Sequence, residues 1–240
     1  MKFDLMQGDC LERMKELPDN SVDLILCDLP YGTTQNKWDS VVPFEPLWEQ
    51  YARVCKGAIV LTAAQPFTSA LVMSNVKGFK YQWVWEKTKA SGFLNARRRP
   101  LTAHEDVVVF GDISKYNPQG LVSVEVNSAR KNKAGSGNFS KVSDRPYIQK
   151  EGNFPRSVLR FQHETKPVHP TQKPVALMEY LIRTYTNEGD VVLDNCMGSG
   201  TTGVACVNTN RNFIGVELDQ AYFDIAKQRI SEAAADKYKN

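Results

Sequence analysis

The stretch Val191–Gly203, which reads VVLDNCMGSGTTG, decides the fold class. It begins with a short apolar, β-branched run, continues through a turn that holds Gly198 and Gly200, and ends in a helical pattern. Glycines let the backbone bend sharply and approach a ligand closely, and the first turn of the following helix presents free N–H groups. A strand, a glycine turn and a helix in this order are typical of the ligand-binding edge of an α/β sheet.

The strand expected after this helix ends in an acidic residue. The stretch 213–217 reads FIGVE, and Glu217 follows Asp194 by 23 residues. At this spacing a carboxylate at a strand tip can bind a ribose diol, although Glu217 could instead cap the helix expected from Asp219. No Walker lysine follows Gly200, and the charge of Asp194 would repel a pyrophosphate. The pattern therefore favours an adenosine with a cationic tail over a dinucleotide.

A second candidate motif follows the mostly apolar run Val22–Cys27, which has the length of a buried parallel strand. It consists of Asp28, Leu29, Pro30 and Tyr31. The proline stiffens the loop, which would then present a carboxylate, a backbone carbonyl and an aromatic ring together. Two acceptors and a stacking face suit a planar base that carries an exocyclic amine. The alternative is a plain turn in which the carboxylate binds nearby N–H groups and the ring packs.

Strand and helix patterns alternate in both halves of the chain. We expect strands at 2–6, 22–27, 58–61, 81–85, 191–193 and 213–216, and helices at 9–17, 44–55, 65–75, 175–185, 201–207 and 219–235. Helices between strands predict a mostly parallel sheet with helices on both faces. The regularity fades in the middle, so we expect two halves of one domain, 1–110 and 167–240, that flank an irregular insert at 111–166.

Composition excludes several classes of protein. The 240 residues are 42% hydrophobic and 24% charged, as in ordinary globular proteins. No run reaches 18 apolar residues, and the N-terminus lacks the apolar core of a secretory signal. The five cysteines form no C-x-x-C pair, which predicts reduced thiols in a cytoplasmic protein. The three histidines are scattered and have no cysteine pairs beside them, so we expect no metal site.

The charge is unevenly distributed. The net charge is +3, but residues 88–165 hold 13 Lys/Arg and 7 Asp/Glu, a local charge of +6. Such a basic region either binds a polyanion such as DNA or RNA or is a solvated loop. Candidates for phosphate contacts are Arg97, Arg98, Arg99, Arg130, Lys131 and Lys133.

Together these motifs resemble those of the β group of amino-methylating DNA methyltransferases, which use S-adenosylmethionine. Residues 28–31 resemble the catalytic D-P-P-Y tetrapeptide of that family, and residues 194–203 resemble its D-P-F-x-G-S-G-T-T-G cofactor loop. Three further stretches agree, namely 8–10 (GDC), 85–87 (WEK) and 169–174 (HPTQKP). Leu29 departs from the pattern but keeps the backbone carbonyl. Asn195 and Cys196 replace Pro-Phe, which removes an aromatic contact with the cofactor.

The resemblance implies a Rossmann-like S-adenosylmethionine-dependent methyltransferase fold and a site-specific transfer of methyl to the 6-amino group of a flipped adenine in double-stranded DNA. The catalytic residues would be Asp28, Leu29, Pro30 and Tyr31. The base would stack on Tyr31 while the carboxylate of Asp28 and the carbonyl of Leu29 hold its amine. The basic insert would recognise the target sequence.

The resemblance also implies the cofactor site. Asp9 would bind the adenine amine, Glu217 the ribose and Lys173 the methionine carboxylate, although Lys173 could equally be a solvated surface residue. The full set is Asp9, Cys10, Lys173, Asp194, Met197, Gly198, Ser199, Gly200, Thr201, Glu217 and Leu218.

Other functions remain open at this point. Relatives that act on the 4-amino group of cytosine commonly begin the tetrapeptide with Ser, so Asp28 favours adenine. RNA, a protein amide, or a catalytically inactive DNA-binding role are further alternatives. For partners, we expect double-stranded DNA, a homodimer and a companion restriction endonuclease, in the cytoplasm of a bacterium or of a bacterium that hosts a phage encoding the protein.

Overall fold

A computed structural model describes residues 1–33, 39–124, 149–162 and 172–237. The chain divides into a larger unit, residues 1–117 with 157–240, and a smaller unit, residues 118–156. All the predicted site residues except Arg130, Lys131 and Lys133 belong to the larger unit. Those three lie outside the described residues.

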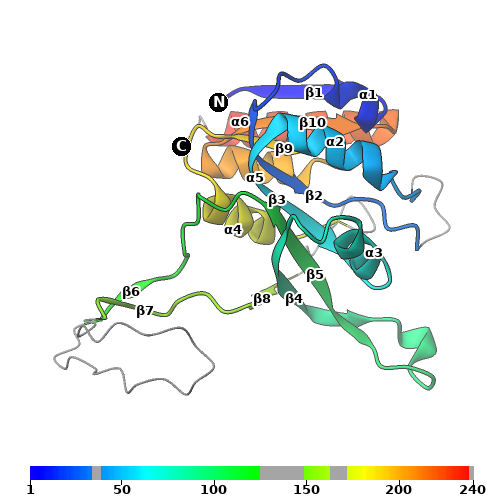
Figure 1. Cartoon of the computed structure of the whole chain (residues 1–240), viewed down its shortest axis with the longest axis vertical. Coiled ribbons are helices and arrows are strands. Elements are labelled where there is room, and N and C mark those ends of the chain that lie inside the picture. Colours follow the sequence, from blue (N-terminus) through cyan, green and yellow to red (C-terminus); the bar gives the residue numbers. More distant parts are fainter. Residues whose placement is uncertain (34–38, 125–148, 163–171, 238–240) are drawn as a thin grey trace. The chain divides into compact units, whose positions relative to one another are not determined.

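The larger unit is built on an eight-stranded sheet with the order β1-β10-β9-β2-β3-β5-β4-β8 (Figure 1). In this order the strands are Phe3–Gln7, Asn212–Glu217, Val191–Asp194, Val22–Cys27, Cys55–Ala63, Thr102–Gly111, Phe79–Ser91 and Val158–Phe161. Strands β1, β10, β9, β2 and β3 are parallel to one another. Strand β5 is antiparallel to β3 and β4, and β8 is parallel to β4. The expected mostly parallel sheet is confirmed.

Helices cover both faces of this sheet, as the alternation of patterns predicts. The first face packs against α1 (Cys10–Met14), α2 (Phe44–Val54) and α3 (Phe67–Ser74). The second face packs against α4 (Val175–Tyr185), α5 (Thr201–Thr209) and α6 (Gln220–Lys237). Successive strand residues point to opposite faces, so Leu24 belongs to the second core and Ile25 to the first. Both faces of the central strands are therefore buried, which explains their near-continuous apolar sequence.

The strands and helices lie close to their predicted positions where the signal is local. Strand β2 and helix α4 have the predicted bounds. Helix α1 is shorter than predicted, and Asp9 is its N-cap, because its carboxylate accepts hydrogen bonds from the backbone N–H groups of Leu11 and Glu12. Strand β5 was not predicted. It pairs with β3 on one side and β4 on the other, so its position depends on long-range pairing.

The smaller unit contains two short antiparallel strands, β6 (Val122–Ser123) and β7 (Glu151–Gly152). Asn153 joins the flanking segments, because its side-chain amide donates to the carbonyl of Gly120 at 2.7 Å. The predicted insert, 111–166, contains this unit and extends beyond it on both sides. In the part of the chain that the structure describes, no helix has the length and apolar character needed to span a membrane.

Candidate active site

The functional motifs meet at one edge of the sheet. Because β1, β10, β9 and β2 are parallel, their carboxyl ends lie side by side, which is where α/β sheets bind ligands. A pocket of about 400 Å³ opens at this edge, within the size range of small-molecule sites. All four predicted catalytic residues line it, and so do the predicted cofactor residues with the exception of Gly200.

The glycine turn has the sharply bent backbone that its sequence predicts. Gly198 and Gly200 have φ angles of +51° and +80°, a region that glycine adopts readily. A Cβ on Gly198 would meet open space, so the backbone at this residue borders the pocket. A Cβ on Gly200 would lie 2.9 Å from the Cβ of Ala226 on α6. Gly200 thus serves the packing of α5 against α6, which explains why it does not line the pocket.

Glu217, the last residue of β10, lines the pocket and also binds two backbone N–H groups beside it. One carboxylate oxygen accepts a hydrogen bond from the N–H of Gly198 at 2.8 Å, and the other accepts from the N–H of Asp219 at 2.8 Å. The two roles considered for this residue are therefore compatible, because each oxygen keeps a second lone pair for a ligand. Burial raises the pKa of Glu217.

Asp194 at the tip of β9 is 2% exposed. Its carboxylate accepts a hydrogen bond from the N–H of Cys196 at 3.2 Å. Burial raises the pKa of this carboxyl group from its ordinary value of 3.8 to about 7. A ligand that brings a positive charge would stabilise the ionised form, so this wall of the pocket suits a sulfonium or an ammonium group.

Asn195 and Cys196, which replace Pro-Phe of the family pattern, also line the pocket, and they were not among the predicted site residues. Asn195 is 1% exposed, and its side-chain oxygen accepts a hydrogen bond from the hydroxyl of Tyr51 on α2 at 2.6 Å. The amide of Asn195 in turn contacts the sulfur of Cys196 at 3.6 Å. A buried side-chain hydrogen bond from α2 therefore holds the loop where the family has Pro-Phe. The sequence signal for these two residues was their position next to Asp194.

Asp28 follows β2 directly and is held by three side chains. One carboxylate oxygen accepts hydrogen bonds from the hydroxyl groups of Tyr31, at 2.9 Å, and Thr62. The other oxygen accepts from the ammonium of Lys173 at 2.7 Å. Thr62 lies on β3 and was not predicted as a site residue. The carboxylate thus lies in the pocket with a fixed orientation.

The ring of Tyr31 stacks on Phe67 of α3, with centroids 5.1 Å apart and planes inclined by 21°. Tyr31 also lines the pocket, so a planar ligand bound there can contact its ring. Burial and the charge of Asp28 raise the pKa of Tyr31, so its hydroxyl stays protonated and donates to the carboxylate.

Lys173 lines the pocket, but its ammonium lies at the tip of β2, a placement that the sequence did not predict. It is 6% exposed and lies 2.7 Å from Asp28 and 3.2 Å from an oxygen of Glu105 on β5. Its Nζ is also 5.5 Å from the ring centroid of Tyr31. Burial alone would lower the pKa of Lys173, but the two carboxylates outweigh burial and raise it.

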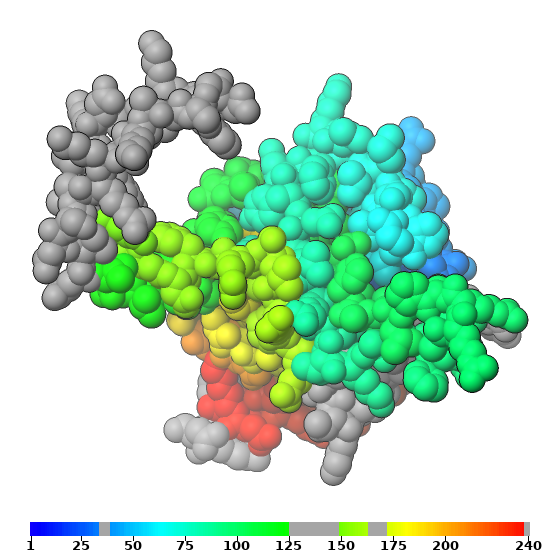
Figure 2. All heavy atoms as spheres, turned by 90° about the horizontal axis from the view of Figure 1, so that it is seen from below, coloured from blue at the N-terminus to red at the C-terminus, as the bar shows by residue number. Residues whose placement is uncertain are grey.

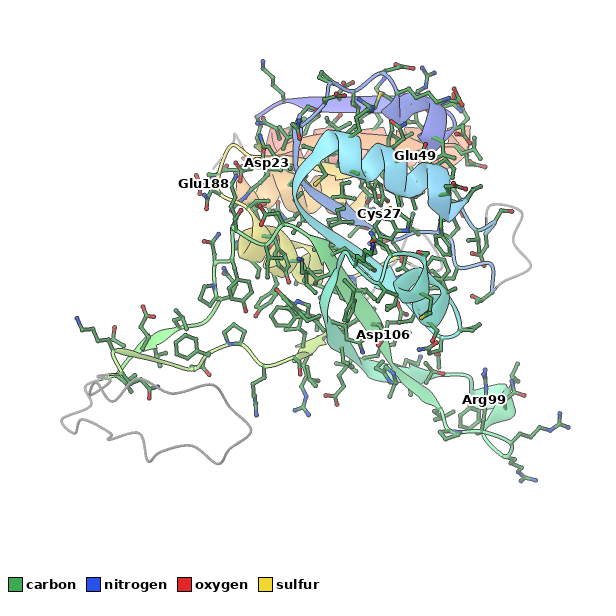
Figure 3. All side chains as sticks on the ribbon, in the orientation of Figure 1. Asp23, Cys27, Glu49, Arg99, Asp106 and Glu188 are labelled. Atoms are coloured by element: carbon green, nitrogen blue, oxygen red, sulfur yellow. The ribbon has the colours of Figure 1, made fainter. Side chains whose placement is uncertain are left out.

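The predicted DNA-contacting residues Arg97, Arg98 and Arg99 lie outside the pocket. They follow a short 3-10 turn, Phe93–Asn95, between β4 and β5, and all three side chains are exposed. Figure 3 shows Arg99 at the outer end of this hairpin, and Figure 2 shows the green hairpin tip at the molecular surface.

A mostly parallel α/β sheet whose strand tips combine a glycine turn, the carboxylates of Asp194 and Glu217 and an Asp-Leu-Pro-Tyr loop is the arrangement expected of an S-adenosylmethionine-dependent methyltransferase. The family model described as "DNA methylase" matches residues 22–228. The chain belongs to this DNA methylase family and is a DNA methyltransferase.

Individual relatives agree with the family. The chain is 30% identical to the DNA adenine methyltransferase YhdJ of Escherichia coli (strain K12), over 96% of this chain and 83% of the relative. It is 29% identical to the type II methyltransferase M.HpaI of Haemophilus parainfluenzae, over 94% of this chain and 73% of the relative.

Solved structures show the same architecture. The M1.HpyAVI–SAM complex matches with a TM-score of 0.63 and 28% identity, covering 95% of this chain and 99% of that chain. The cytosine-N4-specific PvuII DNA methyltransferase matches with a TM-score of 0.66 over 100% of this chain and 92% of that chain. At 17% identity the second match shows the fold alone.

Proposed function

We propose that this methyltransferase modifies the 6-amino group of an adenine that is flipped out of double-stranded DNA. The observation that carries the proposal is the pocket itself, which is lined by Asp28 and Tyr31 together with Asp194 and Glu217. The Asp at the first position of the tetrapeptide and the name of the YhdJ relative both favour adenine over cytosine.

The residues present fit S-adenosylmethionine. Glu217 offers carboxylate lone pairs to a ribose, and Asp9 lies at the same edge of the sheet, where it can accept from an adenine amine. The buried carboxylate of Asp194 suits the positive charge of the sulfonium or the amino group. Met197, Gly198, Ser199 and Thr201 border the space between these acidic residues. Bound there, the cofactor supplies an electrophilic methyl group.

The amine of adenine is a poor nucleophile because its lone pair is delocalised into the ring. In our proposal the carboxylate of Asp28 and the carbonyl of Leu29 accept the two N–H groups, which draws the nitrogen toward tetrahedral geometry and frees the lone pair. Tyr31 holds the plane of the base by stacking. Asp28 also stabilises the positive charge that develops on the amine. Positioning and electrostatics therefore supply the rate, without a covalent enzyme intermediate.

DNA binding requires basic residues outside the pocket. We propose that Arg97, Arg98 and Arg99 contact phosphates, together with Arg130, Lys131 and Lys133. A small recognition region contacts few base pairs, which favours a homodimer. Names of type II relatives support a companion restriction endonuclease, and the five free cysteines suit the reducing cytoplasm of a bacterial cell.

Analysis of the methylated product tests the proposal. Unmethylated genomic DNA is incubated with the protein and methyl-labelled S-adenosylmethionine, digested to nucleosides and analysed by mass spectrometry. We expect label in N6-methyldeoxyadenosine and none in the same DNA incubated without protein. Label in N4-methyldeoxycytidine would show that the target base is cytosine and not adenine. Absence of label from DNA would contradict DNA as the substrate.

A further inference from the structure

Four charged side chains of alternating sign form a row that leads away from the tip of β2. Asp28 pairs with Lys173, Lys173 lies 3.2 Å from Glu105, and Glu105 pairs with Lys87 of β4. The side chains of Lys173, Glu105 and Lys87 are 6%, 14% and 11% exposed. The charges of the row sum to zero, but only Asp28 has a role in the reaction derived so far.

Each carboxylate oxygen of Glu105 makes an ion pair in this row, but one of them lacks a hydrogen bond. Its Oε1 pairs with the ammonium of Lys87, which fixes one side of the carboxylate. Its Oε2 is buried and makes no hydrogen bond to any residue that the structure describes, although the ammonium of Lys173 is only 3.2 Å away. Buried polar atoms are nearly always hydrogen-bonded, and leaving one unpaired is costly. Oε2 of Glu105 can therefore accept a hydrogen bond from the ammonium of Lys173 if that ammonium moves closer.

Lys173 opposes the reaction in its present position. Its ammonium occupies Oδ2 of Asp28 at 2.7 Å, while the hydroxyl groups of Tyr31 and Thr62 occupy Oδ1. A target amine would therefore have to share Oδ2 with the ammonium, since each carboxylate oxygen has two lone pairs. A cation this close also disfavours the positive charge that develops on the amine during transfer.

We propose that Glu105 is a positioning residue that draws the ammonium of Lys173 away from Asp28 when the target base enters. The shift is small, because Nζ already lies within ion-pair distance of both carboxylates. It leaves Oδ2 of Asp28 free for an amine hydrogen, gives Oε2 of Glu105 its missing hydrogen bond, and leaves the charge of the row unchanged. This inference rests on the proposed function, since it assumes that Asp28 binds the target amine.

The substitution Glu105→Gln tests the proposal, because it removes the charge that attracts Lys173 and keeps the size of the side chain. The matched control is Glu179→Gln on α4, a partly buried glutamate that pairs with Arg183 and does not line the pocket. For each protein, four quantities are measured and compared with the wild type: the single-turnover methylation rate at saturating cofactor and DNA, the cofactor Kd, the DNA Kd and the Tm.

We expect Glu105→Gln to slow the single-turnover step by on the order of tenfold to a hundredfold, with both Kd values within twofold of the wild type. The control should keep the wild-type rate. An unchanged rate in Glu105→Gln, or a loss explained by weaker binding of cofactor or DNA, would overturn the inference. A wild-type protein that transfers no methyl group would instead contradict the proposed function.

If Glu105→Gln does not fold, the crystal structure of the wild-type protein with its target DNA decides. Nζ of Lys173 should then lie closer to Oε2 of Glu105 than to Oδ2 of Asp28. An ammonium that still lies on Asp28 beside the bound base would refute the shift.

Discussion

Asp28 and Glu217 line one pocket although their strands, β2 and β10, are separated in the sheet by β9. Two strand spacings correspond to roughly 10 Å, a distance that a nucleoside with a short tail can span. The sheet thus brings the carboxylate proposed to bind the target amine and the carboxylate proposed to bind the ribose to a single pocket. Asp194, at the tip of the intervening strand, places a third carboxylate between them.

Replacement of Asp28 by alanine should abolish methyl transfer and leave cofactor binding intact. The carboxylate is expected to accept the target amine, and the loss of one such group typically costs on the order of 10²-fold or more in rate. Single-turnover transfer of labelled methyl to DNA measures the rate, and isothermal titration with S-adenosylmethionine measures the affinity. An Asp28→Ala protein with wild-type rates would refute the catalytic assignment.

Cofactor affinity should increase as the pH rises through about 7. Burial raises the pKa of Asp194 to about 7, so the folded protein holds a neutral carboxyl group at lower pH. A cationic ligand binds the ionised form, and its binding must release this proton. If only the ionised form binds, the Kd at pH 6 should be roughly tenfold weaker than at pH 8.

Asp194→Asn provides the control for this pH dependence. Its affinity should be weak at every pH, because the amide cannot ionise. A wild-type Kd that does not change between pH 6 and pH 8, or a dependence that persists in Asp194→Asn, would assign the effect to another group.

Replacement of Tyr51 by phenylalanine should destabilise the fold. The hydroxyl of Tyr51 donates to the buried side-chain oxygen of Asn195, and its removal leaves that acceptor unpaired. We expect the free energy of unfolding to fall by about 1–3 kcal/mol, as measured by urea denaturation. Tyr116→Phe, which removes the hydroxyl of an exposed tyrosine, should change stability by less than about 0.5 kcal/mol. Equal effects of the two substitutions would contradict a structural role for the Tyr51–Asn195 contact.

Replacement of Arg97, Arg98 and Arg99 by glutamine should weaken DNA binding to the same extent for target and non-target sequences. Log K falls as log salt concentration rises, and each phosphate contact that is lost makes this negative slope shallower by about 0.9. Fluorescence anisotropy at several salt concentrations measures this slope, with Lys227→Gln on the exposed side of α6 as the control. A slope that remains at the wild-type value would exclude these arginines from the DNA interface.

The sequence was informative where the signal is local. Strand β2 is a continuous apolar run, and α4 has an amphipathic period, so both could be predicted with their bounds. The two motifs were found because each follows a strand directly, and the parallel order of the sheet then brings Asp28 and Glu217 to one edge.

Contacts between distant residues could not be predicted in the same way. Lys173 and Glu105 are 68 positions apart in the sequence and meet because β5 inserts between β3 and β4. Strand β5 has a local signal only in its second half, residues 107–110 (VVVF), since its first half holds the polar run His104, Glu105 and Asp106. Likewise, no pattern links Tyr51 with Asn195, which meet only when α2 packs against the sheet.

A crystal structure of the protein with bound S-adenosylmethionine tests the central claim most directly. The ribose hydroxyl groups should lie within hydrogen-bond distance of Glu217, and the sulfonium methyl group should point toward the space between Asp28 and Tyr31. A cofactor bound outside this pocket, or one whose methyl group points away from Asp28, would contradict the account.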